Sequence, residues 1–291
     1  MLNRIMTPLP PDQHSCGDIW SNLPSMGLVS DLELIAGITI TPACDVSNFK
    51  SETITFLPIV SIQQYLSTLS MLPTVRRKLI ERLTSAGIVS GINWPEPGYE
   101  PPHEGSIDLE IIRLSQILQD QKTKEKHRAH IERALAGLRI TKNCCSTQDR
   151  EANIADYDKL YGSEWSEIKE QIVKNSFRSD IHFLPKSDNS DISYGLAQHS
   201  VALMRYPITV PSEILTRAIS TSEQSWPEFL SSYRSISTAS VLFSKARPIK
   251  ISSLKSQFMS DLLSRFTSLF SRIGSPDFSK FTITKYCAEI E

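Results

Sequence analysis

The hydrophobic and polar positions of the first sixty residues follow the two-residue period of β-strands. Residues 17–20, 34–42 and 53–57 are rich in apolar and β-branched side chains, and residues 48–51 connect the last two of these segments. The pattern predicts three strands near the N-terminus. Three strands alone would leave open sheet edges, so we expect strands from elsewhere in the chain to cover them.

The pattern changes to helical spacing after residue 61. Apolar residues at intervals of three and four predict helices over 62–69, 73–87 and 163–173, and a long helix that starts at Ser106 with a serine cap. The stretch 120–130 of this long helix is almost wholly polar. It is either a solvated helix surface or a break between two helices.

The last third of the chain returns to strand patterns and then ends in a strongly amphipathic helix. Strands are expected at 181–185, 200–210, 239–243 and 248–251, with helices at 212–219 and 227–233 between them. The final helix is expected over 254–273, closed by Gly274. If its apolar stripe packs on the core, Phe266→Ala should cost about 3–5 kcal/mol.

These elements indicate an α+β fold with a small β-barrel and a helical insertion. The barrel is expected to combine residues 1–61 with 179–291, the latter carrying the C-terminal amphipathic helix, and the insertion to span 62–178. Two separate domains are the alternative. Residues 93–105 contain four prolines and two glycines, which predicts a mobile, exposed loop.

Composition sets limits on the class of protein. The chain has 291 residues, 40% of them hydrophobic and 22% charged, with a net charge of −1. These values are ordinary for a globular protein and provide no global attraction to nucleic acid or membrane. Five cysteines, no apolar leader segment and no run of 18 apolar residues favour a cytoplasmic protein without membrane spans.

The N-terminal segment resembles the PemK/MazF family of toxin barrels. The resemblance rests on Gly17-Asp-Ile-Trp20, on Asn48 and on Phe56-Leu-Pro-Ile59, within about 45 residues. It implies a small SH3-like barrel, and in that family the barrel carries an endoribonuclease site.

The catalytic positions of the family are not retained in this chain. The catalytic arginine of the family is replaced by Ala36-Gly37, and the threonine after Pro-Ile is replaced by Val60, although Ser61 follows. RNA cleavage needs a group that stabilises the phosphorane and a base that activates the 2′-hydroxyl. The resemblance therefore implies the barrel without the ribonuclease activity.

A second similarity is to uncharacterised bacterial proteins of defence clusters. These proteins pair a strand that ends in Cys-Asp with a late helix that ends in Arg-hydrophobic-Gly-x-Pro. The matching segments here are Cys44-Asp45 and Arg272-Ile-Gly-Ser-Pro276. The similarity implies a role in anti-phage defence but no biochemical activity.

Three residues are weak candidates for catalysis: Cys44, Asp45 and Ser61. A reactive thiolate at Cys44 would need a nearby base, and only the fold could bring His182 or His199 close to it. The alternative is a buried cysteine followed by an aspartate that stabilises a turn.

The weak candidates for nucleic-acid binding are Lys122, Lys124, Lys126 and Arg128. A solvated helix face is the alternative interpretation. No metal site is expected, because Cys144 and Cys145 are adjacent and no C-x-x-C or H-x-x-x-H motif occurs. No motif requires a cofactor.

No complete catalytic motif occurs anywhere in the chain, so the sequence favours a non-catalytic protein and leaves enzymatic activity open. We expect an interaction or regulatory protein of a bacterial defence or toxin–antitoxin system. Its partner would be another protein encoded in the same operon. The alternative is an RNA- or DNA-binding or endoribonuclease-like protein built on the toxin-like barrel.

Overall fold

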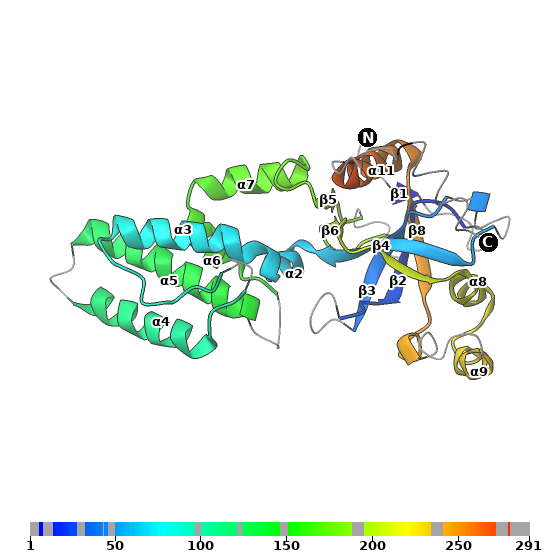
Figure 1. The fold of residues 1–291 in the computed structure, drawn as a ribbon, viewed down its shortest axis with the longest axis horizontal. Coiled ribbons are helices and arrows are strands. Elements are labelled where there is room, and N and C mark those ends of the chain that lie inside the picture. The colour runs from blue at the N-terminus through cyan, green and yellow to red at the C-terminus, as the bar shows by residue number, and fades with distance from the viewer. Residues whose placement is uncertain are drawn as a thin grey trace.

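The computed structural model describes residues 6–7, 14–27, 33–42, 44–45, 50–96, 100–120, 124–145, 151–187, 195–233, 241–271 and 279. The fold is a mixture of helices and an antiparallel sheet that curls into a half-barrel. The molecule is elongated, with a helical lobe at the left of Figure 1 and a sheet lobe at the right.

The sheet joins strands from both ends of the chain. Its strands are β1 (Met6–Thr7), β2 (Asp18–Pro24), β3 (Leu34–Thr39), β4 (Thr53–Ser61), β5 (Ile181–Leu184), β6 (Ser200–Leu203), β7 (Ile208–Pro211) and β8 (Ile249–Leu254). Their order is β1-β8-β2-β3-β4-β6-β5, with β7 also paired to β4. The prediction that segments 34–60 and 180–251 share one sheet is therefore confirmed.

The strand β4 holds the sheet together because it changes partners along its length. Residues 53–56 pair with β7, whereas residues 59–61 pair with β6. Pro58 lies at the step between the two, where its missing N–H costs no ladder hydrogen bond. Gly37 lies opposite Pro58, and any Cβ at Gly37 would come within 2.5 Å of the Phe56 ring.

The helical lobe is built from consecutive helices between β4 and β5. They are α2 (Ile62–Leu66), the 3-10 turn η1 (Leu69–Met71), α3 (Leu72–Ser85), α4 (Glu104–Gln119), α5 (Glu125–Cys145), α6 (Ile154–Tyr161) and α7 (Glu164–Val173). The polar stretch 120–130 contains the break between α4 and α5, and α4 is capped by His103 rather than Ser106.

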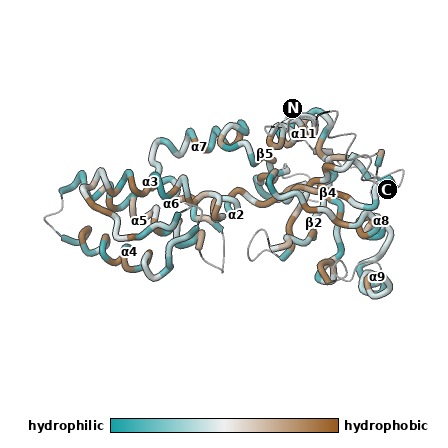
Figure 2. The backbone as a smooth tube through the Cα atoms, in the orientation of Figure 1, coloured by the Kyte–Doolittle hydropathy of each residue, from teal (hydrophilic) through white to brown (hydrophobic). Residues whose placement is uncertain are grey.

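Three helices pack near the sheet in the last third of the chain: α8 (Ser212–Ser220), α9 (Trp226–Ser232) and α11 (Ser256–Phe270). Ile214 and Leu215 of α8 join the same buried cluster as Trp20 of β2. Leu262 of α11 joins a different cluster, with Ile19 of β2. The two clusters lie on opposite faces of β2, because neighbouring residues of a strand alternate between its faces. Figure 2 shows the hydrophobic character of β4 between these layers.

Two expectations about local structure need correction. Val241 and Leu242 are helical rather than part of a strand over 239–243, whose first two residues lie outside the described ranges. The reason is tertiary: the Phe243 side chain is buried in the core, and its carbonyl accepts a hydrogen bond from the Trp226 indole at 3.0 Å. The segment 200–210 is also divided, into β6 and β7, by a turn at Met204.

The described part of the segment 93–105 is only partly exposed. Pro102 is buried, and the Arg76 guanidinium lies 5.4 Å from the centre of the Trp94 ring. The N-terminus of α4 begins within this segment, at Glu104, and residues 97–99 lie outside the described ranges. The expected loop is therefore attached to the helical lobe through the side chains of Trp94 and Pro102.

Candidate functional site

Cys44 and Asp45 form part of a turn after β3. The Asp45 N–H donates to the Pro42 carbonyl at 3.1 Å, and the Asp45 carbonyl accepts the N–H of Lys50 at 2.8 Å and of Ser51 at 3.1 Å. The exposed Cys44 thiol donates to Asp45 Oδ1 at 3.5 Å. The expectation of a buried cysteine is wrong, because Cys44 is exposed, and the hydrogen bonds of Asp45 to Pro42, Lys50 and Ser51 are made by its backbone.

The two histidines that could have activated Cys44 contact other groups. His182 on β5 is buried, with its Nδ1 at 3.9 Å from the Asp261 carboxylate of α11, and burial lowers its pKa to about 4. His199 Nδ1 accepts the Lys186 N–H at 3.1 Å, and its ring lies 5.6 Å from that of Phe183. These contacts give no support to a Cys–His nucleophile.

Ser61 lies at the junction of the two lobes, because β4 continues directly into α2. Its hydroxyl accepts the Gln64 N–H at 3.1 Å, and the Gln64 side chain accepts the Ser61 N–H at 2.9 Å. This is a capping box, which satisfies two backbone donors at the start of a helix. The Ile62 N–H donates to the His199 carbonyl at 3.0 Å and fixes the start of α2 to the sheet lobe.

A cavity of about 300 Å³ opens beside this junction, and we call it the half-barrel cavity. Its walls come from β2, β3, β4, α2 and the segment before β6. The lining residues are Ser21, Asn22, Leu34, Ile35, Ala36, Ile59, Ser61, Gln64, Leu196, Ala197, Gln198 and Ser200. Ala36, one of the two residues that stand in the place of the catalytic arginine in the PemK/MazF resemblance, lines this cavity, and so does Ser61, which follows Val60.

The polar groups of the half-barrel cavity are uncharged. None of its described lining residues is ionisable, and six of them carry a hydroxyl or a carboxamide. Ser21 and Ser200 donate to the backbone carbonyls of Ile249 and Gln198, at 3.3 and 2.9 Å. The Gln198 carboxamide makes no hydrogen bond within the described part of the chain. The cavity therefore offers both donors and acceptors to a ligand.

Asn22 adopts a strained backbone conformation in the wall of the cavity. Its φ of 59° lies in the left-handed region, at a β-bulge between Trp20 and Leu23. The bulge turns the Asn22 side chain so that its Nδ2 donates to the Arg247 carbonyl at 3.0 Å. Bulges and left-handed residues other than glycine are concentrated at functional sites, so this strain supports the cavity as a site.

The basic candidates do not share one face of α5. Lys122 lies outside the described residues. Lys124 precedes α5, which begins at Glu125, and at about 100° per residue Lys126 and Arg128 point to opposite sides of the helix. Arg128 pairs with Glu125 at 3.8 Å. The predicted group is therefore divided, and only Lys126 remains directed toward other cations.

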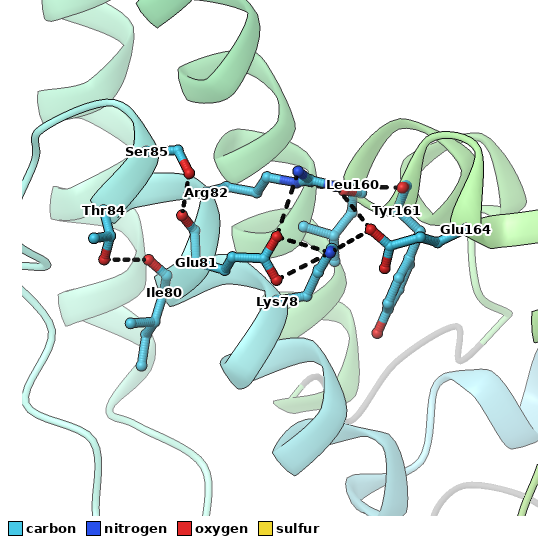
Figure 3. Close-up of polar contacts among 9 residues, drawn as sticks. All are labelled: Lys78, Ile80, Glu81, Arg82, Thr84, Ser85, Leu160, Tyr161 and Glu164. Carbon is cyan, nitrogen blue, oxygen red and sulfur yellow. Dashed lines mark hydrogen bonds and ion pairs between the residues drawn. The ribbon is translucent and has the colours of Figure 1, made fainter.

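Two buried cations in the helical lobe share two carboxylates (Figure 3). Lys78 Nζ lies 2.9 Å from Glu81 and 2.6 Å from Glu164, and Arg82 lies 3.6 and 3.7 Å from the same two groups. The side chains of the cations are 9% exposed, whereas those of the carboxylates are about half exposed. This network links α3 to the start of α7.

Arg82 also caps the C-terminus of α6. Its Nε donates to the Leu160 carbonyl at 3.1 Å and its Nη2 to the Tyr161 carbonyl at 3.3 Å, as Figure 3 shows. These carbonyls have no partner within the helix, and a cation there also interacts favourably with the helix dipole. The network is therefore a structural clamp that holds α6 and α7 on α3.

Asp18 of the Gly-Asp-Ile-Trp segment has a structural role. Its Oδ2 accepts the Lys250 ammonium at 2.9 Å and the Ser15 N–H at 2.7 Å, and this pair joins β2 to β8. Burial raises the pKa of the Asp18 carboxyl, although these two donors act in the opposite direction. The motif that carries the PemK/MazF resemblance thus fixes strand pairing in this chain.

Sequence reasoning missed Asn22, Gln64 and Gln198 as site residues. The capping-box spacing Ser61-Ile-Gln-Gln64 was a signal for Gln64. For Asn22 the only signal was a polar residue within a strand pattern. Gln198 enters the site through tertiary structure alone, because it lies 134 positions after Gln64 in the chain.

Within the described ranges, no group of three or more His, Cys, Asp or Glu residues could hold a metal ion. A search of the same ranges finds no helix with the length and hydrophobicity needed to cross a membrane. No known family model, curated protein or solved structure matches this chain.

Proposed function

We propose that this protein is a non-catalytic interaction or regulatory protein that binds an uncharged, amide-bearing segment of a partner protein in the half-barrel cavity. The observation that carries the proposal is the convergence of carboxamide and hydroxyl groups on a cavity with apolar walls, where none of the described lining residues is ionisable. Such a site pairs well with peptide groups and with Asn, Gln, Ser or Thr side chains.

A charged ligand is disfavoured at this site for a physical reason. A phosphate or carboxylate placed there would lose hydration, and no cation among the described lining residues would replace it. An uncharged amide loses much less hydration, and its donor and acceptor can both find partners among Asn22, Gln64 and Gln198. The chemistry of the cavity therefore supports a peptide-like ligand over an RNA backbone.

The wider context of the proposal comes from the two resemblances of the chain, to the PemK/MazF barrels near its N-terminus and to proteins of defence clusters at Cys44-Asp45 and Arg272-Ile-Gly-Ser-Pro276. They support a cytoplasmic component of a bacterial defence or toxin–antitoxin system, with a partner encoded in the same operon. The replacement of the catalytic arginine by Ala36, within the cavity, supports a binding role for the barrel in place of cleavage.

The proposal is tested by ligand-observed NMR with two small probes. One probe is an acetylated and amidated Ser-Asn dipeptide, and the other is uridine monophosphate. We expect saturation transfer to the dipeptide and a loss of the signal in Asn22→Gly, which keeps the left-handed backbone, and in Gln198→Ala. Gln116→Ala on the exposed side of α4 is the matched control. Stronger binding of the nucleotide would contradict the proposal.

A nuclease assay tests the part of the proposal that assigns no catalytic activity to the protein. The purified protein should not cleave mixed single-stranded RNA above the background rate, because the described lining residues of the cavity include neither an acid–base pair nor a cation. Cleavage that disappears in Ser61→Ala or Asp45→Asn would show that the non-catalytic assignment is wrong.

A further inference from the structure

A second surface with different chemistry lies on α5. Lys126, His130 and Arg133 are spaced by four and three residues, so at about 100° per residue they lie within about 60° of one another. We call these three residues the α5 basic strip. At about 1.5 Å per residue, it extends for about 10 Å along the helix axis.

The acidic residues of this part of α5 lie away from the strip. Glu125 and Glu132 are about 100° and 120° from Lys126 around the helix. Each has a basic partner of its own: Glu125 pairs with Arg128 at 3.8 Å, and Glu132 pairs with Lys159 at 3.3 Å. The carboxylates nearest in the sequence therefore do not neutralise the strip.

Other cations lie close to the middle of the strip. Burial lowers the pKa of His130, and Arg82, Arg133, Lys126 and His127 lower it further by repulsion. His130 Nδ1 is also buried without a hydrogen-bond partner within the described residues. The charge of the strip therefore comes from Lys126 and Arg133, because the lowered pKa of His130 favours its neutral form.

Arg133 is held in position without an ion pair. A Cβ on Gly162 would lie 3.4 Å from Arg133 Nη2, 3.5 Å from Cζ and 3.6 Å from Nη1. These similar distances mean that the guanidinium plane rests against the turn between α6 and α7. No carboxylate of the described residues lies within ion-pair distance of Arg133 or Lys126. The N–H edge of a guanidinium held this way is suited to phosphate oxygens.

Two carboxylates of the helical lobe, at the clamp that contains Arg82, already have partners. Glu81 and Glu164 contact Lys78 and Arg82, as described above for the structural clamp. Two buried cations and two carboxylates balance one another there. Lys126 and Arg133 have no such carboxylate partner among the described residues.

We propose that the α5 basic strip binds the phosphate backbone of a double-stranded nucleic acid. Protein interfaces need an apolar or aromatic core, and single-strand binding uses aromatic stacking platforms. The strip has no Phe, Tyr or Trp, and of the two apolar residues between its members, Ala129 is small and Ile131 is buried in the core. Two cations on one side of a helix, Lys126 and Arg133, are instead suited to contacts with the backbone of a duplex, which carry no sequence information.

The experiment measures fluorescence anisotropy of a labelled 20-base-pair duplex, and of one of its strands alone, with the full-length protein. We expect weak duplex binding, with a Kd of roughly 10⁻⁴ to 10⁻⁶ M, which falls steeply as salt is raised. Each phosphate contact that is removed should reduce the slope of log K against log salt by about one. The double variant Lys126→Glu/Arg133→Glu should lose about tenfold or more in affinity.

Two further variants keep the result decisive. Lys126→Glu alone changes an exposed residue and should lower the affinity without changing the melting temperature. Lys169→Glu makes the same charge change on the exposed surface of α7 and should leave the affinity unchanged. Four results would overturn the proposal: no duplex binding at low salt, equal binding of the single strand, an equal loss in Lys169→Glu, or preferential binding of polyglutamate over the duplex.

Discussion

The sheet lobe and the helical lobe differ in the charge of the groups that they offer to a ligand. The half-barrel cavity of the sheet lobe is lined by uncharged polar groups, whereas the helical lobe has buried cations and the exposed α5 basic strip. The two lobes therefore suit different ligands, a neutral peptide-like group and a phosphate backbone. Binding at the cavity should depend little on salt, and binding at the strip should depend on it strongly.

The lobes also differ in how they bury ion pairs. In the sheet lobe, the side chains of both Asp18 and Lys250 are 5% exposed or less. In the helical lobe, two buried cations share two carboxylates that remain about half exposed to water. A buried pair is sensitive to the loss of one partner, and a shared, hydrated network is less sensitive. The predictions below test this difference.

The largest effect is expected for Asp18→Asn. The substitution keeps the shape of the side chain but leaves the buried Lys250 ammonium facing a neutral amide, so the free energy of unfolding should fall by about 3–5 kcal/mol. Urea denaturation measures this loss. The double variant Asp18→Asn/Lys250→Met should recover part of it, and an unchanged stability of the single variant would contradict the prediction.

A large effect is also expected for Leu262→Ala, in the core between α11 and the sheet. Leu262 is completely buried, so the substitution should cost about 3–5 kcal/mol. Phe266 is only partly buried at the edge of the same cluster, so Phe266→Ala should cost about 1–2 kcal/mol, less than the sequence suggested. Thermal melting of the two variants gives the order, and an equal loss would show that α11 packs differently.

The next effect concerns the pH dependence of stability through His182. Its pKa is about 4 in the folded protein and about 6.5 when unfolded, so the unfolded state binds the proton first as the pH falls. The stability should therefore decrease between pH 6.5 and pH 4, by up to about 3 kcal/mol. In His182→Gln this part of the pH dependence should disappear. The groups that face His182 are Asp261, which favours protonation, and Arg265, which opposes it.

The smallest effect is expected for Glu164→Gln in the helical lobe. Lys78 keeps Glu81 at 2.9 Å, and Glu164 is half exposed, so the loss should be about 1 kcal/mol or less. Urea denaturation of Glu164→Gln and Asp18→Asn under the same conditions compares the two losses of unfolding free energy directly. A loss as large as that of Asp18→Asn would mean that the two lobes do not differ in the way described.

Local patterns predicted most of the elements because their causes are local. The three N-terminal strands, the helix opened by Pro73 and the helices around residues 164–173 and 212–220 follow from periodicity and capping. The sharing of one sheet by both ends of the chain also followed from the sequence, since three strands could not cover their own edges. The prediction of a strand over 239–243 was wrong because the burial of Phe243 against α9 outweighed the strand pattern of the segment.

The candidate site was predictable only in part. Ser61 and Ala36 were identified from the sequence, but their meeting in one cavity depends on the pairing of Ala36 with Ile59 across β3 and β4. The left-handed Asn22 depends on a bulge whose register is set by β8 and β3 together. Neither feature has a local signal, because each results from contacts between segments far apart in the chain.

The sequence by itself determined where the chain forms most of its strands and helices, and that its charges balance overall. Only the tertiary structure decided where those charges act. It enclosed Asp18 with Lys250, surrounded Lys78 and Arg82 with carboxylates, and left Lys126 and Arg133 without any within the described residues. The physical reason is that the energy of a charge depends on its burial and on neighbours in space, which the order of residues along the chain does not specify.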